Sequence, residues 1–238
     1  AGGAGSVIGD TTTTMMWIDG VPPVEVLHAY IAAAVALLIF GVPAARAQQR
    51  FAPIIKDPEP SLAIDWPRML IVLFILVSAV ATNVGVNAKW PELADQFPFI
   101  GTAVAAALLV SIPWRSPDWS VVPGAVKGSV FLLCLVTSAS LMPVDSLPHP
   151  SWQTAFALGF VSAFFDNIPL TALALKQGGY DWGVLAYAVG FGGSMLWFGS
   201  SAGVAICSMF PEARATGRWL REGWLIAVAY VAGFAALL

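Results

Sequence analysis

The chain has 238 residues, of which 58% are hydrophobic and only 11% are charged. A soluble domain usually carries about 25% charged residues, and the mean hydropathy of this chain is +0.78. The net charge is −3, and the sequence holds no basic stripe that could bind nucleic acid. Apolar residues come in runs of about 20, the length of a helix that spans a bilayer. The sequence therefore predicts an all-α polytopic membrane protein in a lipid bilayer, not an enzyme and not a partner of nucleic acid.

The first residues, Ala1 to Gly5, are rich in glycine and start without Met or a signal peptide. We expect a chain that is cut inside a transmembrane element, so that residues 1–18 form the broken-helix segment of a first repeat. The missing N-terminal helices would come from a longer protein or from a partner chain. A homodimer is a further alternative.

Five later apolar runs are long enough to form helices that span the membrane completely. Four of them lie in residues 19–150, which we interpret as connecting and scaffold helices. The fifth ends residues 151–238, which we interpret as the hairpin, broken helix and terminal helix of a second repeat. The runs are Val24–Ala45, Arg68–Val86, Phe97–Pro113, Gly124–Pro143 and Trp219–Leu238.

Two further segments, Ser151–Gln177 and Trp182–Phe210, are long enough to cross but are interrupted. Pro169 predicts a helix break just before it, which leaves pieces of about 14 and 9 residues, too short to cross alone. The positive-inside rule requires the loop with Arg214, Arg218 and Arg221 to be cytoplasmic. This is met if Ser151–Gln177 enters and leaves from the outer face. The segment is therefore predicted to be a re-entrant hairpin.

The second interrupted segment is weakened in its middle by glycines, and it contains one copy of a repeat. The pattern Gly192-Gly193, five residues, Gly199-Ser200-Ser201 matches Gly2-Gly3, five residues, Gly9-Asp10-Thr11 at a constant offset of 190 positions. Four full spans and a hairpin separate the copies, so that they run through the membrane in opposite directions. Such a pattern is typical of inverted-repeat transporters, in which discontinuous helices form the binding site near the midplane. The glycines that weaken the helix are Gly190, Gly192, Gly193, Gly199 and Gly203.

Asp166 lies in an otherwise uncharged stretch of the predicted hairpin. A carboxylate at membrane depth is costly and usually faces a cavity or an ion. Asn167 adds an amide oxygen, and the break before Pro169 frees backbone carbonyls, so Asp166 and Asn167 are candidate Na⁺ ligands. The alternative is that Asp166 caps a helix that begins at Ile168, with Pro169 in its first turn. The two roles are compatible.

Asp10, followed by four threonines, is the second candidate carboxylate. Alone it could be an ordinary helix cap, but it corresponds to Ser200 in the repeat. In both copies glycines would free backbone carbonyls while hydroxyl groups add neutral oxygen ligands. A set of oxygen ligands does not suit a transition metal held by thiolate or imidazole. We therefore expect no cofactor, only Na⁺ or Li⁺ and H⁺ as transported ions.

These strings resemble a known family. Ser162-Ala163, the run Asp166-Asn167-Ile168-Pro169-Leu170 and the Gly-Gly and Gly-Ser-Ser segment resemble NhaD-type sodium/proton antiporters of the ion transporter superfamily. The opening residues 2–13 resemble a mid-chain motif of the same family. The superfamily also contains citrate, dicarboxylate and arsenite transporters. The resemblance implies that a second-half cation site includes Asp166, Asn167 and Ser162 with Ser200 and Ser201 opposite, and that Asp10 and Thr12 serve the first half.

The sequence thus predicts a secondary transporter that exchanges Na⁺ or Li⁺ for H⁺ across the cell inner membrane. Asp10 and Asp166 would alternately bind cation and proton. A transporter of citrate-like carboxylates or inorganic anions from the same superfamily is one alternative, and a non-transporting membrane scaffold is another. Two carboxylates within the membrane favour cations, because an anion carrier needs a basic or neutral centre.

Overall fold

The computed structural model describes residues 3–53, 64–94, 96–144 and 147–238. Every regular element in these ranges is a helix. Three helical stretches are long and apolar enough to cross a membrane: Pro23–Phe51, Trp66–Lys89 and Trp119–Ser138. The prediction of an all-α membrane protein is therefore confirmed. The chain forms two compact units, one made of residues 1–54 and 129–238 and the other of residues 55–128.

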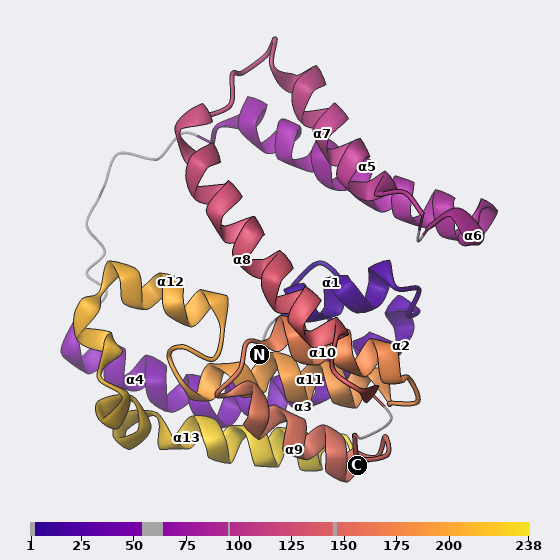
Figure 1. Ribbon diagram of the computed structural model, residues 1–238. Coiled ribbons are helices and arrows are strands. Elements are labelled where there is room, and N and C mark those ends of the chain that lie inside the picture. The colour runs from indigo at the N-terminus through magenta and orange to yellow at the C-terminus, as the bar shows by residue number, and fades with distance from the viewer. Residues whose placement is uncertain (1–2, 54–63, 95, 145–146) are drawn as a thin grey trace. The chain divides into compact units, whose positions relative to one another are not determined.

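The larger unit contains both ends of the chain (Figure 1). Its first helices run through the predicted span Val24–Ala45, and the terminal helix starts three residues before the predicted Trp219. The elements are α1 (Thr11–Ile18), α2 (Pro23–Leu27), α3 (Ala29–Ala36), the π-helical turn η1 (Leu37–Gly41), α4 (Val42–Phe51), α9 (Trp152–Ser162), α10 (Asn167–Gln177), α11 (Trp182–Gly192), η4 (Gly193–Met195), α12 (Ser201–Met209), η5 (Pro211–Arg214) and α13 (Thr216–Ala235).

The smaller unit is built on α5 (Trp66–Lys89), which packs along α7 (Phe99–Ser111) and is followed by the short α6 (Pro91–Ala94). Asp65 caps α5 by accepting the backbone N–H of Arg68 at 3.1 Å, and it pairs with Arg115 beyond the end of α7. The hydrogen bond from Arg68 and the Arg115 guanidinium hold the pKa of Asp65 below its usual range. The short turn η2 (Trp119–Val121) leads into α8 (Val122–Ser140), whose residues divide between the two units.

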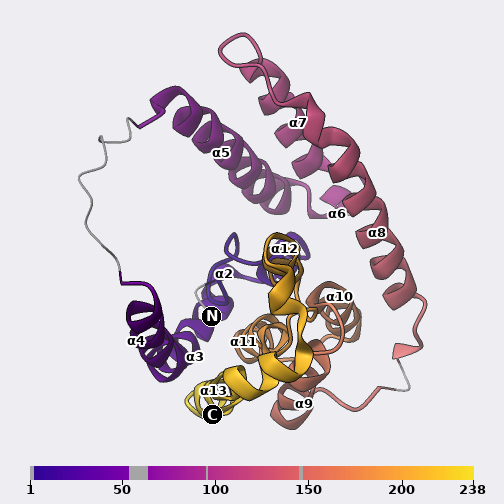
Figure 2. The same cartoon turned by 90° about the vertical axis from the view of Figure 1, so that its left-hand side faces the viewer.

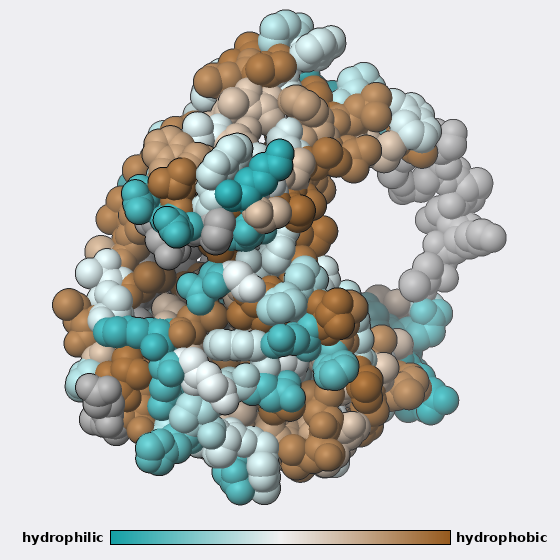
Figure 3. Space-filling model, turned by 90° about the vertical axis from the view of Figure 1, so that its right-hand side faces the viewer, coloured by the Kyte–Doolittle hydropathy of each residue, from teal (hydrophilic) through white to brown (hydrophobic). Residues whose placement is uncertain are grey.

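Large apolar side chains cover the outer faces of the long helices. On α5, for example, Leu70, Leu73 and Val77 are each more than half exposed. Figure 3 shows apolar residues, in brown, reaching the surface beside polar ones on the face in view. A water-soluble monomer rarely exposes apolar area on this scale. Surfaces of this kind suit the hydrocarbon of a bilayer.

Helix α11 forms the centre of the larger unit. Its residues Val184 to Val189 are all buried, so that the helix is enclosed on every side. Helices α9, α10 and α13 and the segment α2–α3 pack around it (Figure 2). A helix in this position can present groups to several neighbours at once.

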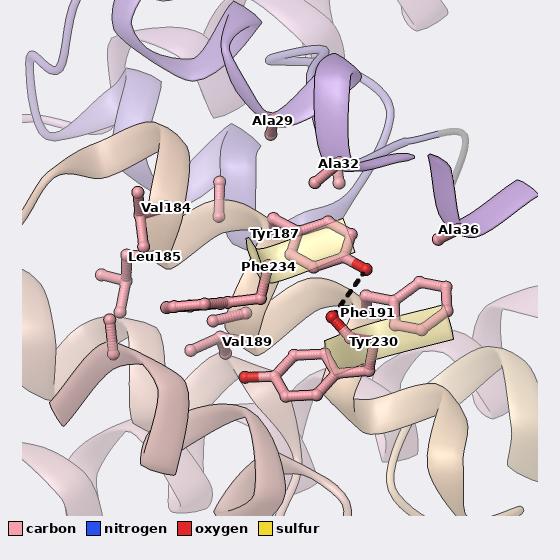
Figure 4. Close-up of a cluster of buried hydrophobic side chains, with 14 of the residues drawn as sticks. Ala29, Ala32, Ala36, Val184, Leu185, Tyr187, Val189, Phe191, Tyr230 and Phe234 are labelled. Carbon is pink, nitrogen blue, oxygen red and sulfur yellow. Dashed lines mark hydrogen bonds between the residues drawn. The ribbon is translucent and has the colours of Figure 1, made fainter. Parts of the chain in front are cut away.

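Two buried tyrosines fix the packing around α11 (Figure 4). The rings of Tyr187 on α11 and Tyr230 on α13 stack with centroids 5.8 Å apart. The Tyr187 hydroxyl donates to the backbone oxygen of Ala229 at 3.0 Å, and the Tyr230 hydroxyl donates to that of Phe156 at 2.7 Å. A Cβ atom at Gly159 would overlap the Tyr230 hydroxyl, and one at Gly233 would overlap that of Tyr187. Each phenol group therefore occupies space that a glycine leaves open on a neighbouring helix.

Gly233→Ala is expected to destabilise the folded protein by about 1–3 kcal/mol, the usual cost of overpacking a core. The added Cβ would overlap the Tyr187 hydroxyl and lie 2.8 Å from the backbone oxygen of Ala32, which cannot move easily. Gly217→Ala is the matched control on α13, because nothing lies within 4 Å of its Cβ position. Thermal unfolding in detergent measures both; equal midpoints for the two variants would contradict this account of the packing.

Both predicted helix breaks are present, but the first lies earlier than predicted. Helix α9 ends at Ser162 and α10 begins at Asn167, with 11 residues in each, not about 14 and 9. Pro169 does not itself break the chain: it occupies the third position of α10, where a missing N–H costs no intrahelical hydrogen bond. Each helix is about 16 Å long, against about 30 Å for the hydrocarbon core. Entry and exit of this segment on one membrane face stays a prediction.

The second break separates α11 from α12. Helix α11 ends at Gly192, η4 follows, and the chain is extended at Leu196 before α12 begins at Ser201. The breaks also contact each other, because a Cβ at Gly199 would lie only 2.5 Å from the backbone oxygen of Ala163. The two interrupted segments therefore meet where their backbones leave helical geometry.

Candidate functional site

The two copies of the sequence repeat share one local backbone conformation. Asp10 precedes α1 and Ser200 precedes α12, and both residues have φ −147° and ψ 151°. The N–H of Gly9 donates to the oxygen of Ser6 at 2.9 Å, and 190 positions later the N–H of Gly199 donates to that of Leu196 at 3.2 Å. The residues of the repeat thus form the same turn followed by a helix, and only the second copy has a side-chain cap, from Ser200.

The glycines of the repeat allow the turn to close on itself. In the first copy a Cβ at Gly3 would overlap the oxygen of Gly9, and in the second a Cβ at Gly193 would lie 2.6 Å from the oxygen of Gly199. Only a residue without a side chain fits either position. This supports a structural repeat; its two-fold axis in the membrane plane and the assignment of residues 19–150 and 151–238 stay predictions.

Asp10 is placed against the predicted hairpin. Its Oδ1 lies 3.3 Å from the Thr11 hydroxyl and 3.5 Å from Nδ2 of Asn167, which can donate a weak hydrogen bond across 157 positions of sequence. Helix α1 packs on both α10 and α11. Asp10 and Asn167, which the sequence assigns to opposite halves of the site, are thus brought together at the N-termini of two helices.

Asp166 is the N-cap of α10. Its Oδ1 accepts the backbone N–H of Ile168 at 2.9 Å, so the capping interpretation holds, with the helix beginning at Asn167 and not at Ile168. The side chain is half-buried. A role in cation binding is compatible with this cap and stays a prediction.

Two buried oxygen atoms near these caps lack hydrogen-bond partners among the described residues. One is Oδ1 of Asn167, whose residue is 4% exposed, and the other is Oγ1 of Thr12, which is fully buried. Leaving a buried polar atom unpaired costs about 1–3 kcal/mol. Both belong to side chains predicted as ligands, and neutral oxygens of this kind suit a small hard cation.

Two of the serines predicted for the site, Ser162 and Ser200, have hydrogen-bond partners within the fold. The buried Ser162 hydroxyl donates to the backbone oxygen of Val189 at 2.8 Å and so ties α9 to α11. Ser200 caps α12 by accepting the N–H of Gly203 at 3.2 Å. The side chain of Ser201 lies outside the described residues. No hydrogen bond among the described residues joins Ser162 or Ser200 to Asp10 or Asn167.

Gly190 is a neighbour of the site that the sequence marks only as a weak point of its helix. A Cβ at this position would lie 2.7 Å from Oδ2 of Asp10. Its proximity to Asp10 depends on the packing of α1 against α11, which no local pattern reveals. The glycine thus leaves space for the carboxylate.

Two plant proteins are similar to this chain. "Sodium/proton antiporter 1" of Arabidopsis thaliana is 29% identical over 245 residues, covering 88% of this chain and 41% of that protein. "Sodium/proton antiporter 2" of the same plant is 26% identical over 250 residues, covering 88% and 57%.

The chain spans about half the length of the curated relatives it matches. No family model matches the chain, and no solved structure matches it. This chain is a distant homologue of two proteins that carry the name sodium/proton antiporter. The two names agree with the resemblance of the sequence motifs to sodium/proton antiporters. They do not say whether this chain belongs to an NhaD-type branch.

Proposed function

We propose that this chain forms the ion-exchanging part of a secondary transporter that moves Na⁺ or Li⁺ against H⁺. The observation that carries the proposal is the contact of Asp10 with Asn167, whose Oδ1 is buried and has no hydrogen-bond partner among the described residues. A cation that replaces this weak hydrogen bond would gain the Asp10 carboxylate and Oδ1 of Asn167, and Thr12 offers a further neutral oxygen from α1. The two relatives named as sodium/proton antiporters support the same reaction and a transporter rather than an enzyme.

Exchange follows from competition at the carboxylate. A charged Asp10 can hold a monovalent cation, whereas a protonated Asp10 has lost the charge that attracts it. Arrival of the cation on one side of the membrane therefore favours release of the proton, and protonation on the other side favours release of the cation. Asp166, one residue before Asn167, supplies a second acidic group at the site.

An anion carrier fits this arrangement less well. Helix N-termini attract anions, and α1 and α10 both begin at the site. Each of these N-termini already holds a carboxylate of the protein, Asp10 or Asp166. An anionic substrate would meet two negative charges there, so a cation is the better occupant.

The test is transport by the purified protein in proteoliposomes with a trapped pH indicator. With an imposed pH gradient, Na⁺ or Li⁺ is expected to move protons, whereas choline as the matched salt is not. Uptake of citrate without any response to Na⁺ would contradict the proposal in favour of the anion carrier. No response to any of these ions would favour a membrane scaffold. An NhaD-type mechanism, the inner membrane as location and a homodimer all stay predictions.

A further inference from the structure

We infer that Gly190 is a positioning residue for the Asp10 carboxylate. Because glycine has no Cβ, the carboxylate keeps the orientation that sets how tightly the site binds its cation. The inference rests on the proposed function and names a determinant of the same site. Gly190 lies inside α11, two residues before that helix ends at Gly192. Glycine is a poor residue for a helix interior, because it weakens the helix relative to alanine. A packing reason would normally explain it.

The surroundings of Gly190 differ from those of three other tightly packed glycines in the helices of this unit. A Cβ at Gly159, Gly192 or Gly233 would meet backbone atoms of a neighbouring helix, which cannot move aside. A Cβ at Gly190 would meet only Asp10, with Oδ2 at 2.7 Å and Cγ at 3.9 Å. Apart from the two chain neighbours of Gly190 and the nearby backbone of α11, no other described atom lies within 4 Å.

A substitution at position 190 can therefore change cation binding without destabilising the fold. The Asp10 carboxylate is the end of a side chain that can rotate, so an alanine at position 190 can be accepted if the carboxylate turns away. Its other oxygen, Oδ1, is the one that faces Asn167 and Thr11. Rotation would therefore change the oxygen that Asp10 presents to the cation, while α11 would gain helix propensity.

The expected phenotype of Gly190→Ala is accordingly unusual. The KM for Na⁺ should rise by about tenfold, the effect of weakening one charge-assisted contact, while the maximal rate falls less. The thermal midpoint in detergent should stay equal or rise. Gly85→Ala is the matched control: it also lies inside a helix, α5, and nothing lies within 4 Å of its Cβ position. This control should leave the KM unchanged.

An infrared measurement tests the positioning without transport. The carboxyl or carboxylate band of Asp10 is identified as the one lost in Asp10→Asn. That band should shift in Gly190→Ala and stay in place in Gly85→Ala. A shifted band in a protein that moves no Na⁺ would sustain the positioning role and refute the proposed antiport. An unshifted band with an unchanged KM would overturn the positioning role alone. A thermal midpoint for Gly190→Ala well below that of Gly85→Ala would also overturn it, because the Cβ would then be rejected by packing.

Discussion

Asp10→Asn is expected to abolish sodium-driven proton movement while the protein stays folded. Asparagine keeps the shape of the side chain and an oxygen on the Asn167 side, so helix α1 should remain in place. It cannot carry the charge that a cation and a proton compete for, and a charge-assisted contact of this kind contributes about 1.5–3 kcal/mol. Exchange in proteoliposomes at matched protein content measures the effect, and we expect sodium-driven proton movement to be lost.

The control for this variant is Asp181→Asn. Asp181 is also an N-cap aspartate: its Oδ1 accepts the N–H of Val184 at 3.0 Å at the start of α11, and the residue is exposed. The substitution therefore reproduces the loss of one negative charge at a helix N-terminus away from Asn167. Normal exchange in Asp181→Asn with none in Asp10→Asn places the effect at the site. Equal losses in both variants would mean that net charge or capping, and not Asp10 itself, is responsible.

Asp166→Asn tests the second acidic group, where capping and ion binding overlap. The observed cap uses only Oδ1, which accepts the N–H of Ile168, and an asparagine oxygen can accept the same hydrogen bond. Folding should therefore survive with a loss of less than about 1 kcal/mol. If Asp166 also carries cation and proton, coupled exchange should disappear, although weak cation binding could remain.

Asp166→Ala completes this test, because it removes the cap as well as the charge. We expect it to lower the thermal midpoint by more than Asp166→Asn does, through the loss of a cap worth about 1 kcal/mol. Exchange that stays pH-coupled in Asp166→Asn but fails in Asp166→Ala would identify Asp166 as a cap only. The carrier of charge would then be Asp10 alone.

Much of this architecture could be predicted from the sequence, because the relevant physics is local. Long apolar runs require helices in a bilayer, since unpaired backbone groups are too costly there. The glycine pattern at residues 2–11 and 192–201 predicts the repeat because glycine alone permits the close turn in each copy. Asp166, three residues before Pro169, predicts the capped start of α10. The position of the first break was wrong by a few residues, because Pro169 fits the first turn of a helix as well as it ends one.

The composition of the site depended on tertiary structure. Asp10 and Asn167 are 157 positions apart, and only the packing of α1 on α10 brings their side chains together. Packing of α1 on α11 gives Gly190 its position beside the carboxylate, and the contact of α9 with α11 gives the Ser162 hydroxyl its partner, the backbone oxygen of Val189. The sequence by itself determined that the two interrupted segments break and that Asp166 caps α10, because propensity, proline geometry and capping act over a few residues. Contacts between helices decided which groups share the site. These contacts join side chains that are far apart in the sequence, so no local sequence pattern reveals them.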